Sequence, residues 1–265
     1  MYTKSFNYHR PGSLAEASTL FQRCGDARYL AGGQTLIPTM KQRLAAPADL
    51  IDLGGLEDLL FIRRSGDTLV IGAGTRHAEV ATWAEVQRVI PALAQLASMI
   101  GDPAVRHRGT LGGSVANNDP GADYPAAVLG LGATVRTTER EIAADDFFTG
   151  MFETALGDGE IVTEIAFSVP EKAGYAKFPN PASRYATVGV FVAKTKTGVR
   201  VAVTGAGPCV FRVPEMETAL ARKYSADAIS GIAMPADGLN SDIHASAEYR
   251  AHLIGVMAKR AIAAA

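Results

Sequence analysis

The chain has 265 residues, with 26 basic and 27 acidic side chains and a formal net charge of −1. Apolar residues make up 48% and charged residues 20%, which excludes wholesale disorder and gives no reason to expect a nucleic-acid partner. Cys24 and Cys209 are too few to hold an iron–sulfur cluster or a structural zinc site. The N-terminus lacks the apolar core of a secretory signal, and the longest apolar stretch, about residues 126–135, is too short to enter a membrane as a span. We expect a soluble, cytoplasmic protein with reduced cysteines.

The first part of the chain alternates between helical and strand patterns. Ser13 and Glu16 form a capping box in front of an apolar helical face. Tyr29-Leu30-Ala31 is typical of a short buried strand and runs into a pair of glycines. This alternation predicts a small α/β unit over residues 1–56. The expected elements are a helix at 14–25, a strand at 29–31, a helix at 37–44 and a strand at 50–53.

The middle part, residues 57–174, begins with a hairpin signal at Ser65-Gly66-Asp67. Residues 102–118 are rich in Gly, Pro, Asn and Arg, and we predict a long irregular loop there, a feature that usually serves function. The other expected elements are strands at 59–63, 68–71, 133–138 and 161–169 and helices at 77–86, 91–100, 124–131 and 145–148.

The last part, residues 175–265, is predicted to be a sheet covered by helices. Two alternating apolar stretches flank Lys196-Thr197-Gly198 and predict a second hairpin. The expected elements are strands at 186–194 and 199–205 and helices at 214–223 and 245–264.

Two glycine segments, residues 30–36 and 108–120, are candidates for phosphate binding. Paired glycines let the backbone approach a ligand closely, and successive N–H groups can then point at phosphate oxygens. Thr35, Thr110 and Ser114 add hydroxyl donors. Neither the Rossmann fingerprint G-x-G-x-x-G nor the P-loop pattern occurs. On their own, these segments leave two interpretations open, plain turns or a clamp for the diphosphate of a dinucleotide.

A longer resemblance favours the clamp. Residues 31–44 (AGGQTLIPTMKQRL) and 101–125 (GDPAVRHRGTLGGSVANNDPGADYP) resemble the FAD-binding medium subunit of the molybdenum hydroxylases, the xanthine dehydrogenase and aerobic carbon monoxide dehydrogenase group. The resemblance continues through residues 175–177, 184–187, 201–207 and 242–250 and so covers the chain. It implies an α+β fold. A two-lobed FAD-binding domain of the vanillyl-alcohol-oxidase (PCMH) type, with subdomains 1–56 and 57–174, would precede a small α+β C-terminal domain, 175–265, of the carbon monoxide dehydrogenase flavoprotein type.

The resemblance also assigns cofactor-binding residues by position. It implies that the two glycine segments hold the FAD diphosphate, that Lys177 lies near the flavin ring, and that Tyr185 shields one flavin face. Structural roles stay open for Asp123 as a helix cap, for Lys177 as a solvated strand residue, and for Tyr185 as packing between domains. The motif at residues 242–250 has no assigned mechanism, and domain packing is the favoured role. The full predicted set is Leu30, Ala31, Gly32, Gly33, Gln34, Thr35, Leu36, Ile37, Ile100, Val105, Gly109, Thr110, Gly112, Gly113, Ser114, Asn117, Asp123, Ile161, Val162, Lys177 and Tyr185.

The resemblance further implies a division of labour between subunits. A large subunit with the molybdenum cofactor would hydroxylate the substrate, and a small subunit would carry [2Fe-2S] clusters, in a dimer of heterotrimers. FAD in this chain would take electrons singly from the clusters and pass pairs to a quinone, NAD⁺ or oxygen. We therefore expect an oxidoreductase subunit with no catalytic and no metal-binding residue of its own. Two alternatives stay open, a stand-alone flavin-dependent oxidase or reductase of the same cofactor fold, and a non-catalytic nucleotide-binding or scaffold module.

Overall fold

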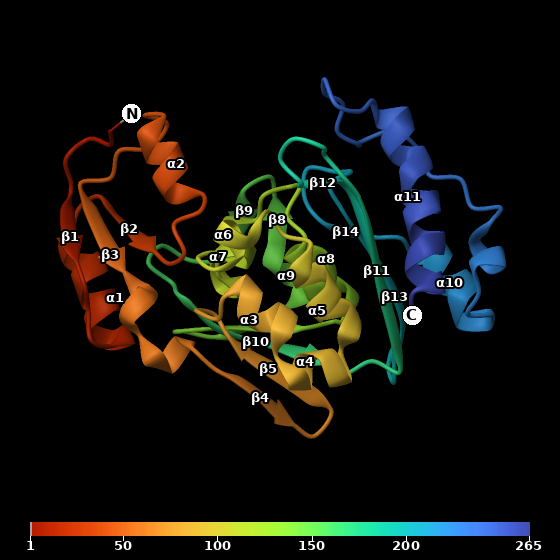
Figure 1. Ribbon diagram of the computed structural model, residues 1–265, viewed down its shortest axis with the longest axis horizontal. Coiled ribbons are helices and arrows are strands. Elements are labelled where there is room, and N and C mark those ends of the chain that lie inside the picture. Colours follow the sequence, from red (N-terminus) through yellow and green to blue (C-terminus); the bar gives the residue numbers. More distant parts are fainter. Residues whose placement is uncertain (1) are drawn as a thin grey trace.

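The structure, a computed structural model, describes residues 2–265, so Met1 of the predicted unit 1–56 lies outside it. The N-terminal elements are β1 (Asn7–His9), α1 (Leu14–Arg23), β2 (Ala27–Leu30), α2 (Leu36–Lys41), β3 (Asp49–Asp52) and the short 3-10 helices η1 (Leu53–Gly55) and η2 (Glu57–Leu59). The three strands form a parallel sheet in the order β1–β3–β2 at one end of the molecule (Figure 1). Ser13 caps α1 by accepting a 3.2 Å hydrogen bond from the N–H of Glu16, which is one half of the predicted capping box; the Glu16 carboxylate accepts from the N–H of Gly12 rather than that of Ser13.

The central part is built on a five-stranded antiparallel sheet. Its elements are β4 (Ile62–Ser65), β5 (Thr68–Gly72), α3 (His77–Thr82), α4 (Ala84–Val89), α5 (Pro91–Ser98), α6 (Pro103–Arg106), α7 (Leu111–Asn117), α8 (Tyr124–Gly130), β6 (Thr134–Thr137), β7 (Glu141–Ala143), α9 (Ala144–Phe147), β8 (Phe148–Gly150), β9 (Glu153–Thr154) and β10 (Val162–Ser168). The strand order is β4–β5–β10–β6–β7, so the last strand in the chain lies in the middle of the sheet. Helices α3, α5 and α8 lie above this sheet in Figure 1.

The C-terminal part is a four-stranded antiparallel sheet between two layers of helices. Its elements are β11 (Lys172–Pro179), β12 (Ala186–Thr195), β13 (Gly198–Thr204), β14 (Phe211–Arg212), α10 (Pro214–Arg222), η3 (Ala226–Ile229) and α11 (Ala247–Ala263). Because successive strand residues point to opposite faces, Phe191 and Ala193 belong to the central core, whereas Val190 and Val192 pack with α10 and α11. Burial on both faces explains the nearly unbroken apolar run of β12.

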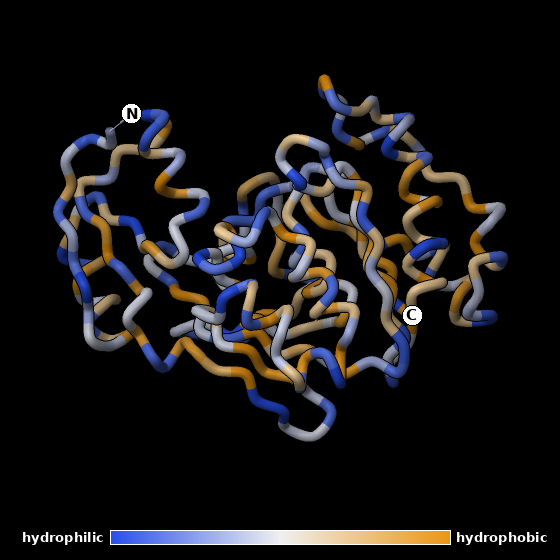
Figure 2. The backbone as a smooth tube through the Cα atoms, viewed as in Figure 1, coloured by the Kyte–Doolittle hydropathy of each residue, from blue (hydrophilic) through white to orange (hydrophobic). Residues whose placement is uncertain are grey.

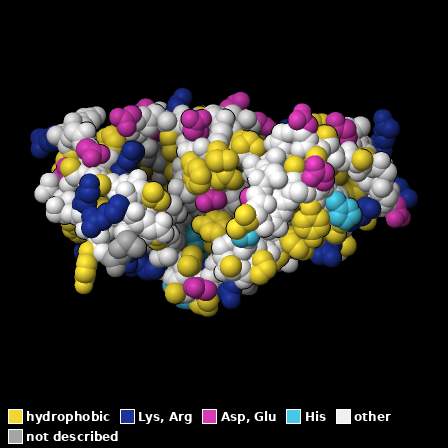
Figure 3. Space-filling view, turned by 90° about the horizontal axis from the view of Figure 1, so that it is seen from above, with side chains coloured by type: hydrophobic (Ala, Val, Ile, Leu, Met, Phe, Trp, Pro, Cys, Tyr) yellow, Lys and Arg dark blue, Asp and Glu magenta, His cyan; other side chains and the backbone are white. Residues whose placement is uncertain are grey.

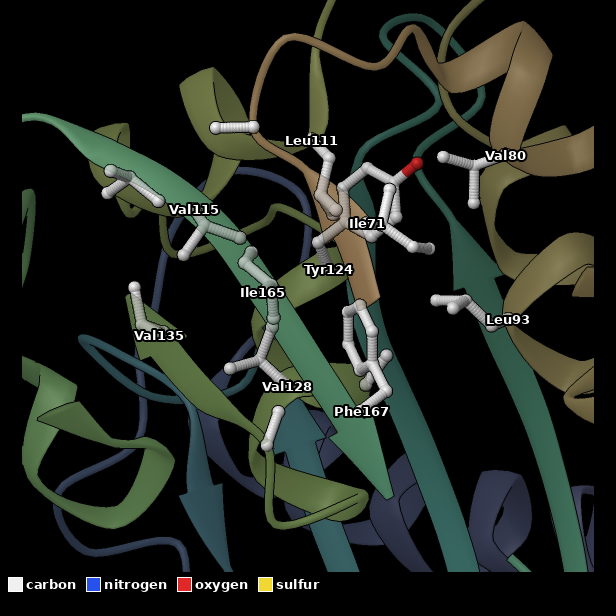
Figure 4. Close-up of a cluster of buried hydrophobic side chains, with 14 of the residues drawn as sticks. Ile71, Val80, Leu93, Leu111, Val115, Tyr124, Val128, Val135, Ile165 and Phe167 are labelled. Atoms are coloured by element: carbon white, nitrogen blue, oxygen red, sulfur yellow. The ribbon is translucent and has the colours of Figure 1, made fainter. Parts of the chain in front are cut away.

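The central core fixes the position of the second glycine segment. Figure 4 shows Leu111 and Val115, one helical turn apart on α7, among the side chains of Ile71, Ile165 and Phe167 from β5 and β10. Leu111 and Val115 are fully buried, so α7 is anchored on the sheet by this face. In Figure 2 the apolar segments follow the strands and the helix faces opposite them, and polar segments mark turns such as that between β4 and β5.

The prediction of an irregular loop over residues 102–118 is wrong. This segment contains α6 and α7, which both begin at capping residues. The carboxylate of Asp102 accepts a 2.9 Å hydrogen bond from the N–H of Val105, and the hydroxyl of Thr110 accepts a 3.2 Å bond from the N–H of Gly113. These side chains satisfy N–H groups that a short helix otherwise leaves free, so helices form despite the glycines.

Other element boundaries also differ from the predictions. The helix predicted at 77–86 is divided by Trp83, which is extended and separates α3 from α4. The strand predicted at 59–63 begins later, as β4, because Leu59 belongs to η2. The strand pattern missed β1, β7, β8, β9, β11 and β14. The predicted third range starts at residue 175, inside β11, and the division of the chain into 1–56, 57–174 and 175–265 stays a prediction. Within residues 2–265, no helix combines the length and apolar character needed to cross a membrane.

Candidate functional site

A cavity of about 640 Å³ lies between the N-terminal and central parts. Figure 3 shows the surface hollowed between these parts, with the N-terminal part on the left. Both glycine segments line it, and nearly all of the predicted site residues meet there. Those that line the cavity are Leu30, Ala31, Gly32, Gly33, Gln34, Thr35, Leu36, Ile100, Val105, Gly109, Thr110, Gly112, Gly113, Ser114, Asn117, Asp123, Ile161, Val162 and Tyr185. Ile37 and Lys177 are not among its lining residues.

The backbones of the two glycine segments are in direct contact. A Cβ atom at Gly32 would lie 2.3 Å from the carbonyl oxygen of Arg108 and 2.7 Å from the Cα of Gly109. No other residue type fits at Gly32 without moving the backbone of the second segment. Gly33 has φ +72°, a conformation that L side chains rarely adopt. The glycines of the first segment are therefore required both by a close approach and by the turn that leads into α2.

The first segment offers free donors to the cavity. The main-chain N–H groups of Gly33, Gln34 and Thr35 find no acceptor among residues 2–265. Such successive N–H groups in a turn that begins with a left-handed glycine form a concavity suited to anions. In the second segment, by contrast, the N–H groups of Leu111 and Gly112 donate to Thr75 and Ala73 at 2.9 and 2.8 Å. The second segment therefore contributes mainly the hydroxyls of Thr110 and Ser114 and the open Cα face of Gly113.

Asp123 lies in a buried charged cluster at the cavity wall. The hydroxyl of Tyr175 donates to its carboxylate, and the ammonium of Lys177 lies 3.0 Å from a carboxylate oxygen. Lys177 also donates to the carbonyls of Met99 and Arg184, at 2.9 and 3.0 Å, so all three of its N–H bonds are used. Burial raises the pKa of Asp123. The positive charge of Lys177 and the hydrogen bonds from Tyr175 and Lys177 oppose that rise.

These contacts decide the roles that the sequence left open. The Asp123 carboxylate is bound to Tyr175 and Lys177 rather than to the N-terminus of α8, so the helix-cap interpretation is wrong. The Lys177 side chain is only 2% exposed, so it is no solvated strand residue. Tyr185 is 45% exposed at the cavity rim, so it is no fully buried core residue, and its side chain also packs beside Gly121 of the central part.

Glu160 and His77 are among the cavity-lining residues that were not singled out from the sequence. Burial alone would raise the pKa of Glu160, but hydrogen bonds from Arg140, the N–H of Gly157 and Thr137 lower it to about 2. This carboxylate therefore stays ionised and fully engaged, and it does not transfer protons at neutral pH. In the sequence, His77 is an isolated histidine that belongs to no recognisable motif. For Glu160, the only indication in the sequence is its place in a turn just before Ile161.

Within residues 2–265, the motif at residues 242–250 holds parts of the C-terminal fold together. The buried guanidinium of Arg250 donates to the carbonyls of Thr187 and Gly205, at 2.7 and 2.9 Å, and pairs with Asp242 at 2.7 Å. These contacts join α11 to the ends of β12 and β13, which agrees with the favoured packing role.

We expect Arg250→Met to lower the free energy of unfolding by about 3 kcal/mol, because two buried carbonyls lose their donor and Asp242 loses its partner. Urea unfolding of the full chain measures this loss. Arg260→Met, at the exposed end of the same helix, is the matched control and is expected to be nearly neutral. An Arg250→Met protein as stable as the wild type would contradict the packing role.

A two-lobed cleft with opposed glycine segments, followed by a sheet-and-helix domain, defines a class of cofactor-binding flavoprotein. The family model described as "FAD binding domain in molybdopterin dehydrogenase" matches residues 4–171. The chain belongs to the FAD-binding medium subunits of the molybdenum hydroxylases.

Relatives of this family match the chain over its whole length. The chain is 36% identical to the carbon monoxide dehydrogenase medium chain of Hydrogenophaga pseudoflava, covering 100% of this chain and 98% of the relative. It is 34% identical to the nicotine 6-hydroxylase medium subunit of Paenarthrobacter nicotinovorans, with 99% and 98% covered. Among solved structures, carbon monoxide dehydrogenase from Hydrogenophaga pseudoflava has a TM-score of 0.90 at 36% identity, with 100% and 98% covered. Quinoline 2-oxidoreductase from Pseudomonas putida 86 has a TM-score of 0.90 at 29% identity, with 99% and 97% covered.

These comparisons confirm the resemblance stated from the sequence. The α+β fold, FAD as the cofactor of this chain, and its membership as an oxidoreductase subunit of a molybdenum hydroxylase are confirmed. The chain is the medium chain of a multi-subunit complex of the carbon monoxide dehydrogenase type. The full-length match to medium chains favours a subunit over a stand-alone oxidase or an empty scaffold.

Proposed function

We propose that FAD lies in the cavity between the N-terminal and central parts, with its diphosphate where the two glycine segments meet. The observation that carries this proposal is the close contact of Gly32 with Gly109, both of which line the same cavity. The predicted site residues that line this cavity are the proposed cofactor contacts. Lys177 does not line the cavity, and its proposed contribution is to pair with Asp123, which does.

The residues present fit such a group. The free N–H groups of the first segment and the hydroxyls of Thr110 and Ser114 suit anionic diphosphate oxygens. Apolar side chains such as Ile100, Val105 and Ile161 suit the faces of flat rings. Tyr185, at the rim, is the proposed cover of one flavin face. The carboxylates of Asp123 and Glu160 at the cavity wall are engaged with basic and hydroxyl partners, so neither is free to act as a catalytic acid or base.

The proposed function is to relay electrons within a larger complex. When bound, FAD would supply redox chemistry that links single-electron iron–sulfur centres to a two-electron external acceptor, and the residues lining the cavity would set its position and access. We assign the molybdenum cofactor to a large partner subunit and the [2Fe-2S] clusters to a small one, in a dimer of heterotrimers. The words "medium chain" and "medium subunit" in the relatives' names support two partners of different size. We also propose a cytoplasmic location, to which the free thiols of Cys24 and Cys209 are suited.

Native mass analysis of the complex purified from its source tests this function. We expect one FAD for each copy of this chain, together with a larger chain that carries molybdenum and a smaller chain rich in cysteine. A colourless chain that binds no flavin when FAD is added would contradict the cofactor site. Turnover of a small reductant by the isolated chain would instead support the stand-alone enzyme.

A further inference from the structure

His77 lies under the second glycine segment. It is the first residue of α3, it is 4% exposed, and it lines the cavity. Its main-chain N–H donates to the carbonyl of Gly109 at 3.0 Å. Its imidazole packs directly against Gly109, where a Cβ atom would lie 2.4 Å from Nε2. On its other side the imidazole contacts the ring of Tyr124, with ring centroids 5.3 Å apart. The imidazole is therefore held between the core and the segment proposed to bind diphosphate.

This imidazole has no hydrogen-bond partner within the chain. Among residues 2–265, neither ring nitrogen is paired, and Nδ1 is completely buried. A buried polar group without a partner is costly, and an apolar ring would fill the same space without that cost. Nδ1 is enclosed by the protein, so Nε2 is the nitrogen that a ligand can reach, and an unpaired Nε2 at a cavity wall points to a partner supplied by a ligand in the cavity.

The protonation state of His77 determines which partner it can take. Burial, with a smaller contribution from the charge of Arg106, lowers the pKa of His77 to about 4, so the ring is neutral at pH 7. A neutral imidazole carries one N–H donor and one acceptor nitrogen. A proton on Nδ1 would bury an unpaired donor, which folded proteins avoid more strictly than an unpaired acceptor. The proton therefore belongs on Nε2, the nitrogen beside Gly109.

We propose that the Nε2–H of His77 donates a hydrogen bond to a diphosphate oxygen of the dinucleotide bound at the two glycine segments. Diphosphate oxygens at neutral pH carry negative charge and only accept hydrogen bonds, so they match a neutral donor. This inference rests on the proposed FAD site and adds a contact from a third segment, α3. Because the donor is neutral at pH 7, the contact adds no positive charge to the cavity.

Ligand affinities of the full chain, stripped of flavin, test this contact. We expect His77→Phe to weaken binding of FAD and of ADP about tenfold or more, because hydrogen bonds to charged acceptors are among the strong ones. Binding of riboflavin, which has no diphosphate, is expected to stay within about twofold of the wild-type value, since uncharged contacts elsewhere are untouched. His77→Gln keeps a donor and is expected to retain most of the ADP affinity. His107→Phe, at an exposed histidine at the end of α6, is the matched control and is expected to change nothing.

Nitrogen-15 NMR of labelled histidines in the wild-type chain gives a second readout that needs no variant to bind. We expect one histidine, identified by its absence in His77→Gln, to be neutral at pH 7 with its proton on Nε2, and to shift when ADP binds. A proton on Nδ1, or unchanged ADP affinity in folded His77→Phe, would overturn the inference while leaving the FAD site intact. A wild-type chain that binds neither FAD nor ADP would overturn the cofactor site and this contact with it.

Discussion

Replacing Gly113 with valine is expected to yield a folded protein that no longer retains FAD. Gly113 lies in the first turn of α7 and faces the space between the two glycine segments. A Cβ atom there would lie 2.7 Å from the hydroxyl of Thr110 and 3.7 Å from the Cβ of Ala31 in the first segment. The methyl groups of valine would extend into the gap proposed for the diphosphate, whereas the buried side of α7, with Leu111 and Val115, would be undisturbed.

The expected size of the effect follows from crowding at a close contact. Overpacking costs about 1–3 kcal/mol, which corresponds to a loss of affinity of up to about 100-fold. We expect Gly113→Ala to fall between the wild type and Gly113→Val, because its single methyl group crowds the Thr110 hydroxyl but makes only an ordinary contact with Ala31. The measurements are flavin absorbance per mole of purified chain and circular dichroism, which reports whether the fold is kept.

Gly255→Val is the matched control for this substitution. Gly255 lies in α11, and a Cβ atom there meets nothing within 4 Å. This variant is expected to bind flavin as the wild type does. A folded Gly113→Val protein with a full complement of flavin would show that the diphosphate does not pass between the two segments.

The sequence predicted those elements whose burial or capping is encoded locally. The pattern of residues 186–194 predicted one strand of a hairpin, which is β12, and Pro91 predicted the start of α5. The pattern failed at α7, because its buried residues are Leu111, Gly112 and Val115, and the glycine adds no apolar side chain from which a helical period could be recognised. Thr110 was the signal that would have revealed this helix, since its hydroxyl caps the first turn.

Long-range contacts were invisible in the sequence. β11 was missed because Lys172 and Lys177 interrupt its apolar positions, and Lys177 is buried only because Asp123, 54 residues away in the chain, pairs with it. The glycine segments were found because close backbone approach and positive φ restrict the residue type at each position. His77 left no such signal, since its role depends on the surroundings that folding gives a single side chain.

The buried pair of Asp123 and Lys177 is expected to respond asymmetrically to mutation. Asp123→Asn leaves the ammonium of Lys177 buried with two carbonyls and no opposite charge, and should lower the free energy of unfolding by about 3–5 kcal/mol at pH 7. Lys177→Met leaves the carboxyl group of Asp123 buried without its partner, and this group can take up a proton instead. The loss in free energy of unfolding caused by Lys177→Met therefore depends on pH. The double variant, Asp123→Asn with Lys177→Met, should recover much of the loss because no buried charge remains.

The sign of the pH dependence follows from the pKa of Asp123. Burial raises this pKa, and Lys177 opposes the rise, so removing Lys177 moves the folded-state pKa of Asp123 still further above its unfolded value of about 3.9. Between these two values the folded state binds more protons than the unfolded state, and stability falls as the pH rises. Lys177→Met should therefore be most stable near pH 4 and lose stability toward pH 8 more steeply than the wild type, whereas Asp123→Asn should lack this component.

Urea unfolding of the full chain at several pH values between 4 and 8 measures both effects. Lys194→Met is the matched control, because Lys194 pairs with Glu171 at the surface with both side chains about half exposed, and its loss should cost less than about 1 kcal/mol at any of these pH values. If Lys177→Met shows the same small, pH-independent loss as Lys194→Met, the buried pair does not stabilise this wall of the cavity. If the loss in free energy of unfolding of Lys177→Met grows with pH, and this pH dependence vanishes in the double variant, the Asp123 carboxylate is held ionised at the cavity by Lys177.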